Sequence, residues 1–213
     1  MKPPIHLERR SHEGARFISP TAQRNSPHIA KILSEHISGA ASFLEIASGT
    51  GQQGLAICQA IANLTWQPSD PDAASRASID SWAAELGRSR IKSALNIDVT
   101  IESWWQELAG NYDHMFCANM IHIAPVSALK GLARGAGKIV PSGGMLFLYG
   151  PFLDGDKSAA SNLAFDANLK QRNSSWGVRE LDFVKPIFAS RGLIYQKRIP
   201  MPAENHILIF KRV

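Results

Sequence analysis

Apolar and polar positions alternate with two different periods along this chain of 213 residues, and each change of period marks a boundary between elements. Short, nearly continuous apolar runs are typical of strands buried on both faces of a sheet. Apolar residues spaced three and four apart are typical of helices with one buried face. The strands predicted in this way are 42–47, 64–68, 91–99, 112–119 and 145–149, and the helices between them are 20–36, 52–63, 72–86, a short one at 103–108, and 125–140.

The last third of the chain has a different pattern. A long polar connection, 150–177, is expected to carry a short helix of its own, because connections of this length in compact domains are usually functional. A helix over 178–191 ends at Gly192, and two strands follow at 193–199 and 206–211. Strand and helix therefore alternate until two strands come in succession. The pattern predicts an α/β fold with a Rossmann-like, doubly wound, mostly parallel sheet and an antiparallel last strand.

A single domain over 1–213 is expected, because no stretch reads as a flexible linker. Within it, 20–38 is interpreted as an N-terminal helical cap, with Ser26 and Pro27 offering an N-cap and a first-turn proline. The connection 150–177 is interpreted as an insertion that forms a lid. The composition, 45% hydrophobic and 19% charged, is that of an ordinary soluble protein.

The start of the chain, MKPPIHLERR, lacks the apolar core of a secretory signal, and no apolar run is long enough to cross a bilayer. We therefore expect a cytoplasmic protein without a membrane partner. Cys58 and Cys117 fall in a predicted helix and a predicted strand, so burial is expected and neither a metal site nor a disulfide is indicated. The formal charge of +5 is spread along the chain and is densest near 8–10, which leaves nucleic acid as a less favoured partner.

The stretch EIASGTGQQG, 45–54, fits two loops that bind different cofactors. Its tail matches the G-x-G-x-x-G fingerprint of dinucleotide folds, and the whole stretch matches the E-x-x-x-G-x-G loop of class I methyltransferases. Glu45 decides between them, since a dinucleotide site does not require an acid inside the first strand. A carboxylate there favours a cationic ligand, and burying it without a partner would cost several kcal/mol.

Acidic residues also end the next two predicted strands. Asp70 is placed to accept hydrogen bonds from ribose hydroxyls, although it could equally cap the following helix, and a dinucleotide site wants an acid at the same distance. Asp98 is placed to bind an adenine amino group, with the backbone of Val99 beside it. The residues predicted to contact S-adenosylmethionine are Glu45, Ala47, Ser48, Gly49, Gly51, Asp70, Asp98, Val99 and Asn119.

Several motifs in order resemble one known family. EIASGTG, WQPSD, NIDV, NMIHIAP, LYGPF, SNLAFDANLKQR, WGVRE and MPAENHILIF resemble the methyltransferase-like 26 group, which is placed in the class I S-adenosylmethionine-dependent methyltransferase superfamily. The resemblance runs from about residue 24 to the C-terminus. It implies a seven-stranded sheet with a reversed last strand, and it implies no particular substrate.

Candidate catalytic residues follow the fourth predicted strand. His122 is the candidate general base, because its ordinary pKa lies near physiological pH, and Asn119 could hold the methyl acceptor or the cofactor. The alternative is that His122 bonds the backbone and orders its loop. The residues predicted to bind substrate are Arg24, Asn25, Tyr149, Phe152, Asn162, Asp166 and Arg172.

The favoured hypothesis is an S-adenosylmethionine-dependent methyltransferase that acts on a small molecule as a monomer or homodimer. Three alternatives stay open: a module that binds the cofactor without catalysis, an RNA methyltransferase, and an NAD(P)-dependent oxidoreductase. The last lacks an obvious Tyr-x-x-x-Lys proton relay.

Overall fold

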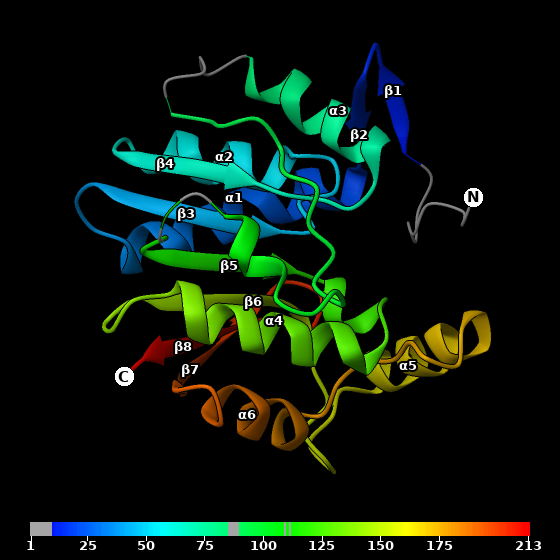
Figure 1. Ribbon diagram of the computed structural model, residues 1–213. Helices are drawn as coiled ribbons and strands as arrows, with labels where there is room; N and C mark the ends of the chain where they lie inside the picture. Colours follow the sequence, from blue (N-terminus) through cyan, green and yellow to red (C-terminus); the bar gives the residue numbers. More distant parts are fainter. Residues whose placement is uncertain (1–9, 85–89, 109, 111) are drawn as a thin grey trace. The chain divides into compact units, whose positions relative to one another are not determined.

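The computed structural model describes residues 10–84, 90–108, 110 and 112–213 (Figure 1). Internal contacts divide the chain into two compact units, Met1–Asp98 and Val99–Val213. The single domain expected from the sequence stays a prediction. None of the helices in the described part of the chain is long and apolar enough to cross a membrane.

The first unit contains a small hairpin, three helices and two strands of the main sheet. These elements are β1 (Ser11–Glu13), β2 (Arg16–Ile18), α1 (Pro20–His36), β3 (Ala41–Ile46), α2 (Gln52–Ala60), β4 (Leu64–Pro68) and α3 (Ala73–Ala83). β3 and β4 are parallel, and Glu45 of β3 lies opposite Pro68 of β4. The hairpin of β1 and β2, which the sequence analysis did not predict, packs on α3 through a hydrogen bond from the Phe17 N–H to Ser78 Oγ (2.8 Å).

The N-cap expected at Ser26 is wrong, although the helix itself is confirmed. Ser19 caps α1 by accepting a hydrogen bond from the Ala22 N–H (2.9 Å), and Pro20 fills the first turn. Pro27 lies inside the helix, directly after Ser26, whose hydroxyl donates to the Ala22 carbonyl (2.6 Å). The chain contains two Ser-Pro pairs, and periodicity alone did not show which one begins the helix.

The strand predicted over 91–99 is also wrong. The described segment forms only isolated parallel bridges to the β4 region, at Ile91 and Leu95. Between these bridges the Ala94 N–H donates to Asp80 Oδ1 of α3 (2.8 Å), which takes the segment out of the ladder. Segment 91–95 therefore runs where the seventh strand was expected, without forming a regular one. The predicted end of the preceding helix, residue 86, lies outside the described residues.

The second unit contains four sheet strands and the remaining helices. These elements are η1 (Trp104–Glu107), β5 (His114–Ala118), η2 (Met120–His122), α4 (Val126–Ile139), β6 (Met145–Pro151), α5 (Ala160–Arg172), α6 (Leu181–Ala189), β7 (Leu193–Met201) and β8 (Asn205–Arg212). β5 and β6 are parallel, whereas β8 is antiparallel to both β6 and β7. The reversed last strand is thus confirmed. α4 and α6 lie together on one face of these strands (Figure 1).

Both cysteines are buried, as predicted, with Cys58 in α2 and Cys117 in β5. The part of the chain that the structure describes holds no group of three or more His, Cys, Asp or Glu side chains placed to bind a metal ion.

Trp104 packs against α4 at two glycines, Gly131 and Gly135. Its indole Nε1–H donates to the Gly131 carbonyl (3.1 Å), and a Cβ atom on Gly135 would overlap the indole ring. A Cβ atom on Gly131 would overlap the Val99 carbonyl. Glycine costs helix stability, so its presence at these two positions of α4 reflects this close packing.

This packing predicts that Gly135→Ala destabilises the protein. Replacing Gly by Ala inside a helix usually stabilises by about 0.5–1 kcal/mol. Here the added methyl group displaces the Trp104 indole, and the free energy of unfolding should fall by about 1–3 kcal/mol, as in other overpacked cores. Urea unfolding measures the difference. Ser127→Ala, at an exposed position of the same helix, is the matched control and should change stability by less than about 0.5 kcal/mol. A stabilised Gly135→Ala variant would contradict the argument.

Candidate functional site

The bend after β3 exposes bare backbone. Ala47, Gly49 and Gly51 all have left-handed φ angles, of 58°, 61° and 90°. At Gly51, the N-cap of α2, a Cβ atom would come within 3.0 Å of the Ile79 backbone, so only glycine fits comfortably. At Gly49 a Cβ atom would meet mainly the Arg10 guanidinium, at 3.7 Å. The bend therefore permits a close approach of a ligand to the main chain.

Asp70 is tied directly to this bend. The Gly49 N–H donates to Asp70 Oδ2 (3.0 Å), and the Asp72 N–H donates to Oδ1 (2.9 Å). Burial raises the pKa of Asp70, and these two hydrogen bonds act against that shift. Each carboxylate oxygen has a second acceptor position, so a pair of ribose hydroxyls would fit. Asp70 does not cap α3, because Asp72 does so by accepting from the Ser75 N–H (2.8 Å).

Glu45 lies beneath the bend, almost fully buried at 1% exposure. A Cβ atom on Gly54 of α2 would overlap the Trp66 indole and come within 2.6 Å of Glu45 Oε2, so this glycine makes room for both side chains. Burial raises the pKa of Glu45 to about 8, and the Ser48 and Trp66 side chains offset part of the effect. At neutral pH the carboxyl group is therefore mostly protonated until a cation approaches it.

Ser48 and Ser69 lock the ends of the two strands together. The Ser48 N–H donates to the Ser69 carbonyl (2.9 Å), the Ser69 N–H donates to Ser48 Oγ (3.2 Å), and Ser69 Oγ donates to the Glu45 carbonyl (2.7 Å). The first unit thus brings together Glu45, Ser48, Gly49 and Asp70, and their contacts with a cofactor stay predictions. Asp98 is half-buried at the end of the same unit, and Val99 is buried at the start of the next, where its carbonyl meets α4. Their cofactor contacts stay predictions.

His122 lies in the second unit, 1% exposed. Its Nδ1 accepts from the Arg179 N–H (3.3 Å), which places the ring proton on Nε2. Nε2 faces Gly150, where a Cβ atom would come within 2.8 Å, and the ring meets Phe152 edge-on with centroids 5.1 Å apart. Burial, followed by the nearby Arg179 charge, lowers the pKa of His122 to about 3. A histidine with this pKa is a weak base at neutral pH.

Asn119 stands beside His122 at a left-handed φ of 59°. Its N–H donates to the Tyr149 carbonyl (2.8 Å), and its side-chain Oδ1 lies near Gly150 on the same side as His122 Nε2. Asn119, Tyr149 and Phe152 are therefore gathered around His122 at the ends of β5 and β6. Tyr149 and Phe152 are 2% and 1% exposed.

The sequence analysis missed the role of Arg179, although it quoted the motif WGVRE that contains it. The guanidinium donates to the carbonyls of Ile121 (2.9 Å), Ala124 (2.7 Å) and Ser175 (3.1 Å). The Gly177 N–H also donates to the His122 carbonyl (2.9 Å). Arg179 therefore clamps the loop that carries His122. An Arg two residues after a glycine, at the end of a polar connection, is the only signal the sequence offers for this role.

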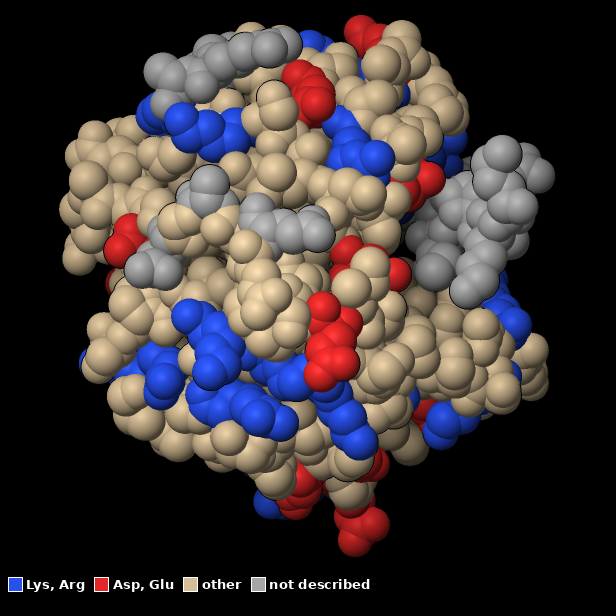
Figure 2. All heavy atoms as spheres, in the orientation of Figure 1, with Lys and Arg blue, Asp and Glu red and all other residues tan. Residues whose placement is uncertain are grey.

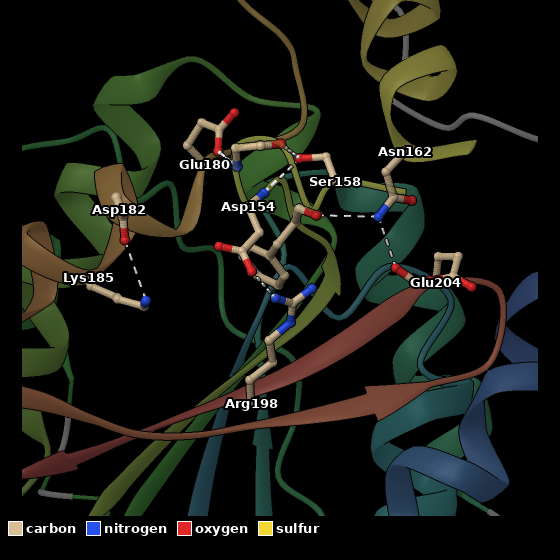
Figure 3. Close-up of polar contacts among 10 residues, drawn as sticks. Asp154, Ser158, Asn162, Glu180, Asp182, Lys185, Arg198 and Glu204 are labelled. Carbon is tan, nitrogen blue, oxygen red and sulfur yellow. Dashed lines mark hydrogen bonds and ion pairs between the residues drawn. The ribbon is translucent and has the colours of Figure 1, made fainter. Parts of the chain in front are cut away.

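Asn162 and Asp166, predicted to bind substrate, make hydrogen bonds within the protein, and their contact with a substrate stays a prediction. Asn162 Nδ2 donates to the carbonyls of Glu204 (3.0 Å) and Phe152 (3.3 Å), as Figure 3 shows. Asp166 accepts from the Val178 N–H (2.9 Å) and pairs with Lys170 (2.6 Å).

The same segment has a further ion pair. Asp154 binds Arg198 of β7 at 2.8 Å (Figure 3). Residues 150–177 do contain a helix, α5, as predicted, and these contacts hold it on the second unit.

Three other predicted substrate residues lie on α1 and α5. Arg24 is exposed on α1 and donates to Thr21 Oγ1 (3.2 Å), and Asn25 is half-buried on the same helix. Arg172 is exposed in the last turn of α5. Their contact with a substrate stays a prediction.

Comparison with known proteins adds a family and a fold. A model of the family described as "Protein of unknown function (DUF938)" matches residues 16–212. Among solved structures, an O-methyltransferase family protein from Burkholderia thailandensis is 16% identical, with a TM-score of 0.74 over 88% of this chain and 56% of that one.

Two further structures are similar to the same degree. An O-methyltransferase family 2 protein from Planctomyces limnophilus, in complex with apigenin, is 18% identical with a TM-score of 0.73, over 91% of this chain and 58% of that one. The SAH-bound form of CalO1, a methyltransferase of calicheamicin biosynthesis, is 14% identical with a TM-score of 0.73, over 91% and 54%. The chain thus spans little more than half the length of these structures, and it has the class I methyltransferase fold.

The burial of His122 predicts a specific loss of stability in acid. The folded protein keeps the ring neutral down to a pKa of about 3, whereas the unfolded chain binds a proton near the ordinary value of 6.5. The free energy of unfolding is therefore unaffected by this histidine above pH 6.5. It falls as the pH falls toward 3, because only the unfolded chain binds the proton. Between pH 7 and pH 5 the loss amounts to roughly 2 kcal/mol.

Urea unfolding of His122→Gln at both pH values tests this expectation. The variant should lose about 2 kcal/mol less between pH 7 and pH 5 than the wild-type protein, whatever its stability at pH 7. His28→Gln, at an exposed position of α1, is the control and should keep the wild-type difference. Equal pH dependence in His122→Gln and the wild-type protein would show that the ring is not held neutral.

Proposed function

The chain belongs to the family described as Protein of unknown function (DUF938), and from this premise we propose that it is an S-adenosylmethionine-dependent methyltransferase acting on a small molecule. The observation that carries the proposal is the glycine bend, where Asp70 receives the Gly49 N–H and Glu45 lies buried beneath. We further propose that the chain is related to the methyltransferase-like 26 group, on the motifs from EIASGTG to the final strand.

The charges around the bend support a sulfonium nucleoside over a dinucleotide. Glu45 ionises only beside a cation, so it does not favour the doubly charged pyrophosphate of NAD, whereas an acid at Asp70 suits the ribose of either cofactor. S-adenosylmethionine carries positive charge and two ribose hydroxyls, which these acids can match. The structures with a similar fold include an O-methyltransferase family protein in complex with the small aromatic molecule apigenin, which supports a small acceptor.

When bound, S-adenosylmethionine supplies a sulfonium methyl group that can be transferred by in-line displacement. In the first unit, Asp70 would accept the ribose hydroxyls, Glu45 would offset the positive charge, and Asp98 would accept from the adenine amino group. The backbones of Ala47, Ser48, Gly49 and Gly51 would line the cofactor. Displacement needs positioning and exclusion of water more than it needs a strong base.

The second unit would serve the methyl acceptor. A neutral His122 has an Nε2–H to donate, and Asn119 presents a carboxamide on the same side of Gly150. We propose that these two groups orient the acceptor, because a ring with a pKa of about 3 removes protons poorly at neutral pH. An acceptor that loses its proton readily, or carries none, fits this arrangement.

A second candidate acceptor, RNA, rests on the surface of α4. Lys130, Arg134 and Lys138 are spaced four residues apart, so they form one row, and Figure 2 shows Lys and Arg side chains gathered over this helix. Arg191 lies against the same helix at Gly137. A row of Lys and Arg side chains binds the phosphates of a nucleic acid whatever its base sequence, and this binding weakens steeply with added salt.

Calorimetry with S-adenosylhomocysteine and with NADH tests the proposed cofactor. The wild-type protein should bind S-adenosylhomocysteine and not NADH. Asp70→Asn should weaken that binding about 10- to 100-fold, which is the size of effect expected for hydrogen bonds to a charged group. Asp72→Asn is the matched control two residues away, since Asn also caps helices well, and it should bind normally. Binding of NADH in place of S-adenosylhomocysteine would defeat the proposal.

Transfer of a labelled methyl group to fractions of a cell extract then identifies the acceptor. Label in the small-molecule fraction supports the main proposal, and label in the RNA fraction supports the second candidate. A protein that binds the cofactor and transfers no label to either fraction would be a binding module instead of an enzyme.

The raised pKa of Glu45 predicts that binding of the proposed cofactor is coupled to the release of a proton from this carboxyl group. The carboxyl group is mostly protonated at neutral pH, since its pKa is about 8, and a cation nearby favours its ionised form. Binding of S-adenosylmethionine at pH 7 should therefore release more protons from the wild-type protein than from Glu45→Gln. Calorimetry in two buffers with different ionisation enthalpies measures the release. The same release from both proteins would show that the cofactor does not ionise Glu45.

A further inference from the structure

The N-terminal hairpin is anchored to the first unit through α3. Arg16 of β2 donates to the Ser81 carbonyl (3.1 Å) and lies over the Trp82 ring at 4.7 Å. The Trp82 indole in turn donates to the Phe17 carbonyl (3.1 Å). These contacts fix the hairpin along α3, so the residue that precedes β1 has a defined place.

That residue is Arg10, and it lies over the bend. Its Nη2 is 3.7 Å from the position that a Cβ atom on Gly49 would occupy, and its guanidinium is 5.7 Å from the centre of the Phe17 ring. The charge of Arg10 also favours the ionised form of Asp70. The Arg10 guanidinium therefore lies beside Gly49, on the side where a side chain at position 49 would otherwise project.

Neutralising Asp70 does not account for this placement by itself. Both Asp70 oxygens already accept backbone N–H groups, from Gly49 and Asp72. Arg10 reaches the bend from another part of the chain, and its planar group suits a carboxylate in two-point contact. The amino acid end of S-adenosylmethionine carries a carboxylate, and the roles proposed for Glu45, Asp70 and Asp98 leave that group without a cationic partner.

Resting on the proposed function, we infer that Arg10 binds the carboxylate of the cofactor's amino acid end, which makes the N-terminal hairpin a part of the cofactor site. The hairpin carries the cation to Gly49, and α3 holds the hairpin in place. Arg10 would thus distinguish ligands that have the amino acid carboxylate from ligands that lack it.

Two nucleosides that differ only in this carboxylate test the inference. Calorimetry should compare S-adenosylmethionine with decarboxylated S-adenosylmethionine, using wild-type protein and Arg10→Gln. The variant should bind S-adenosylmethionine about 10- to 100-fold more weakly, as expected for a lost charge-assisted pair. Its affinity for the decarboxylated ligand should change less than about twofold. Arg10→Lys should recover part of the lost affinity, because it keeps the charge and loses the two-point geometry.

Lys31→Gln is the control for net charge, since Lys31 is exposed on α1 of the same unit. It should bind both ligands as the wild-type protein does. Thermal unfolding without ligand checks that Arg10→Gln remains folded. An equal loss for both ligands would mean that Arg10 acts through Asp70 or through the hairpin, and no loss for either would mean that it takes no part; each result overturns the inference.

The outcomes also separate this inference from the proposed function. Failure of the wild-type protein to bind either sulfonium nucleoside overturns the proposed function, and the role of Arg10 with it. Normal binding by the wild-type protein together with unchanged selectivity in Arg10→Gln overturns the role of Arg10 alone.

Discussion

The hydrogen bond from the Gly49 N–H to Asp70 Oδ2, 3.0 Å long, joins the bend after β3 to the end of β4. It fixes the backbone where two glycines and Ala47 adopt left-handed φ angles, and such a backbone persists only when its surroundings hold it. The same bond orients the carboxylate whose remaining acceptor positions suit a ribose. The serine pair at the ends of the same strands supports it through backbone bonds. The proposed cofactor site thus depends on contacts between neighbouring strand ends.

Burial sets the protonation of one ionisable group in each unit. Glu45 and His122 are both about 1% exposed, and burial favours the neutral form of each. The pKa of the carboxyl group rises to about 8, and that of the imidazole falls to about 3. Neither group is charged in the neutral range without a ligand. Neither of these two groups therefore carries charge before a cofactor binds, which is consistent with a methyl transfer that relies on positioning.

Polar side chains in the long connection after β6 illustrate a limit of reading function from residue type. Asn162 and Asp166 look like substrate ligands in the sequence, because they are polar residues in a long loop. In the structure both are buried and satisfy buried backbone groups: Asn162 donates to the carbonyl of Phe152, and Asp166 accepts from the N–H of Val178. A buried backbone group left without a partner costs as much as a lost hydrogen bond, and these side chains supply the partners.

The sequence by itself determined the α/β class, the reversed last strand and the glycine bend with its two acids, because these depend on local periodicity and on residues close together in the chain. Tertiary structure decided the rest. Ser19 instead of Ser26 caps α1, and Asp80 draws the segment before Asp98 out of the ladder, since both outcomes depend on competing partners. The hairpin that brings Arg10 to Gly49 and the clamp that Arg179 places on the His122 loop join residues distant in the chain, and no local pattern records such contacts.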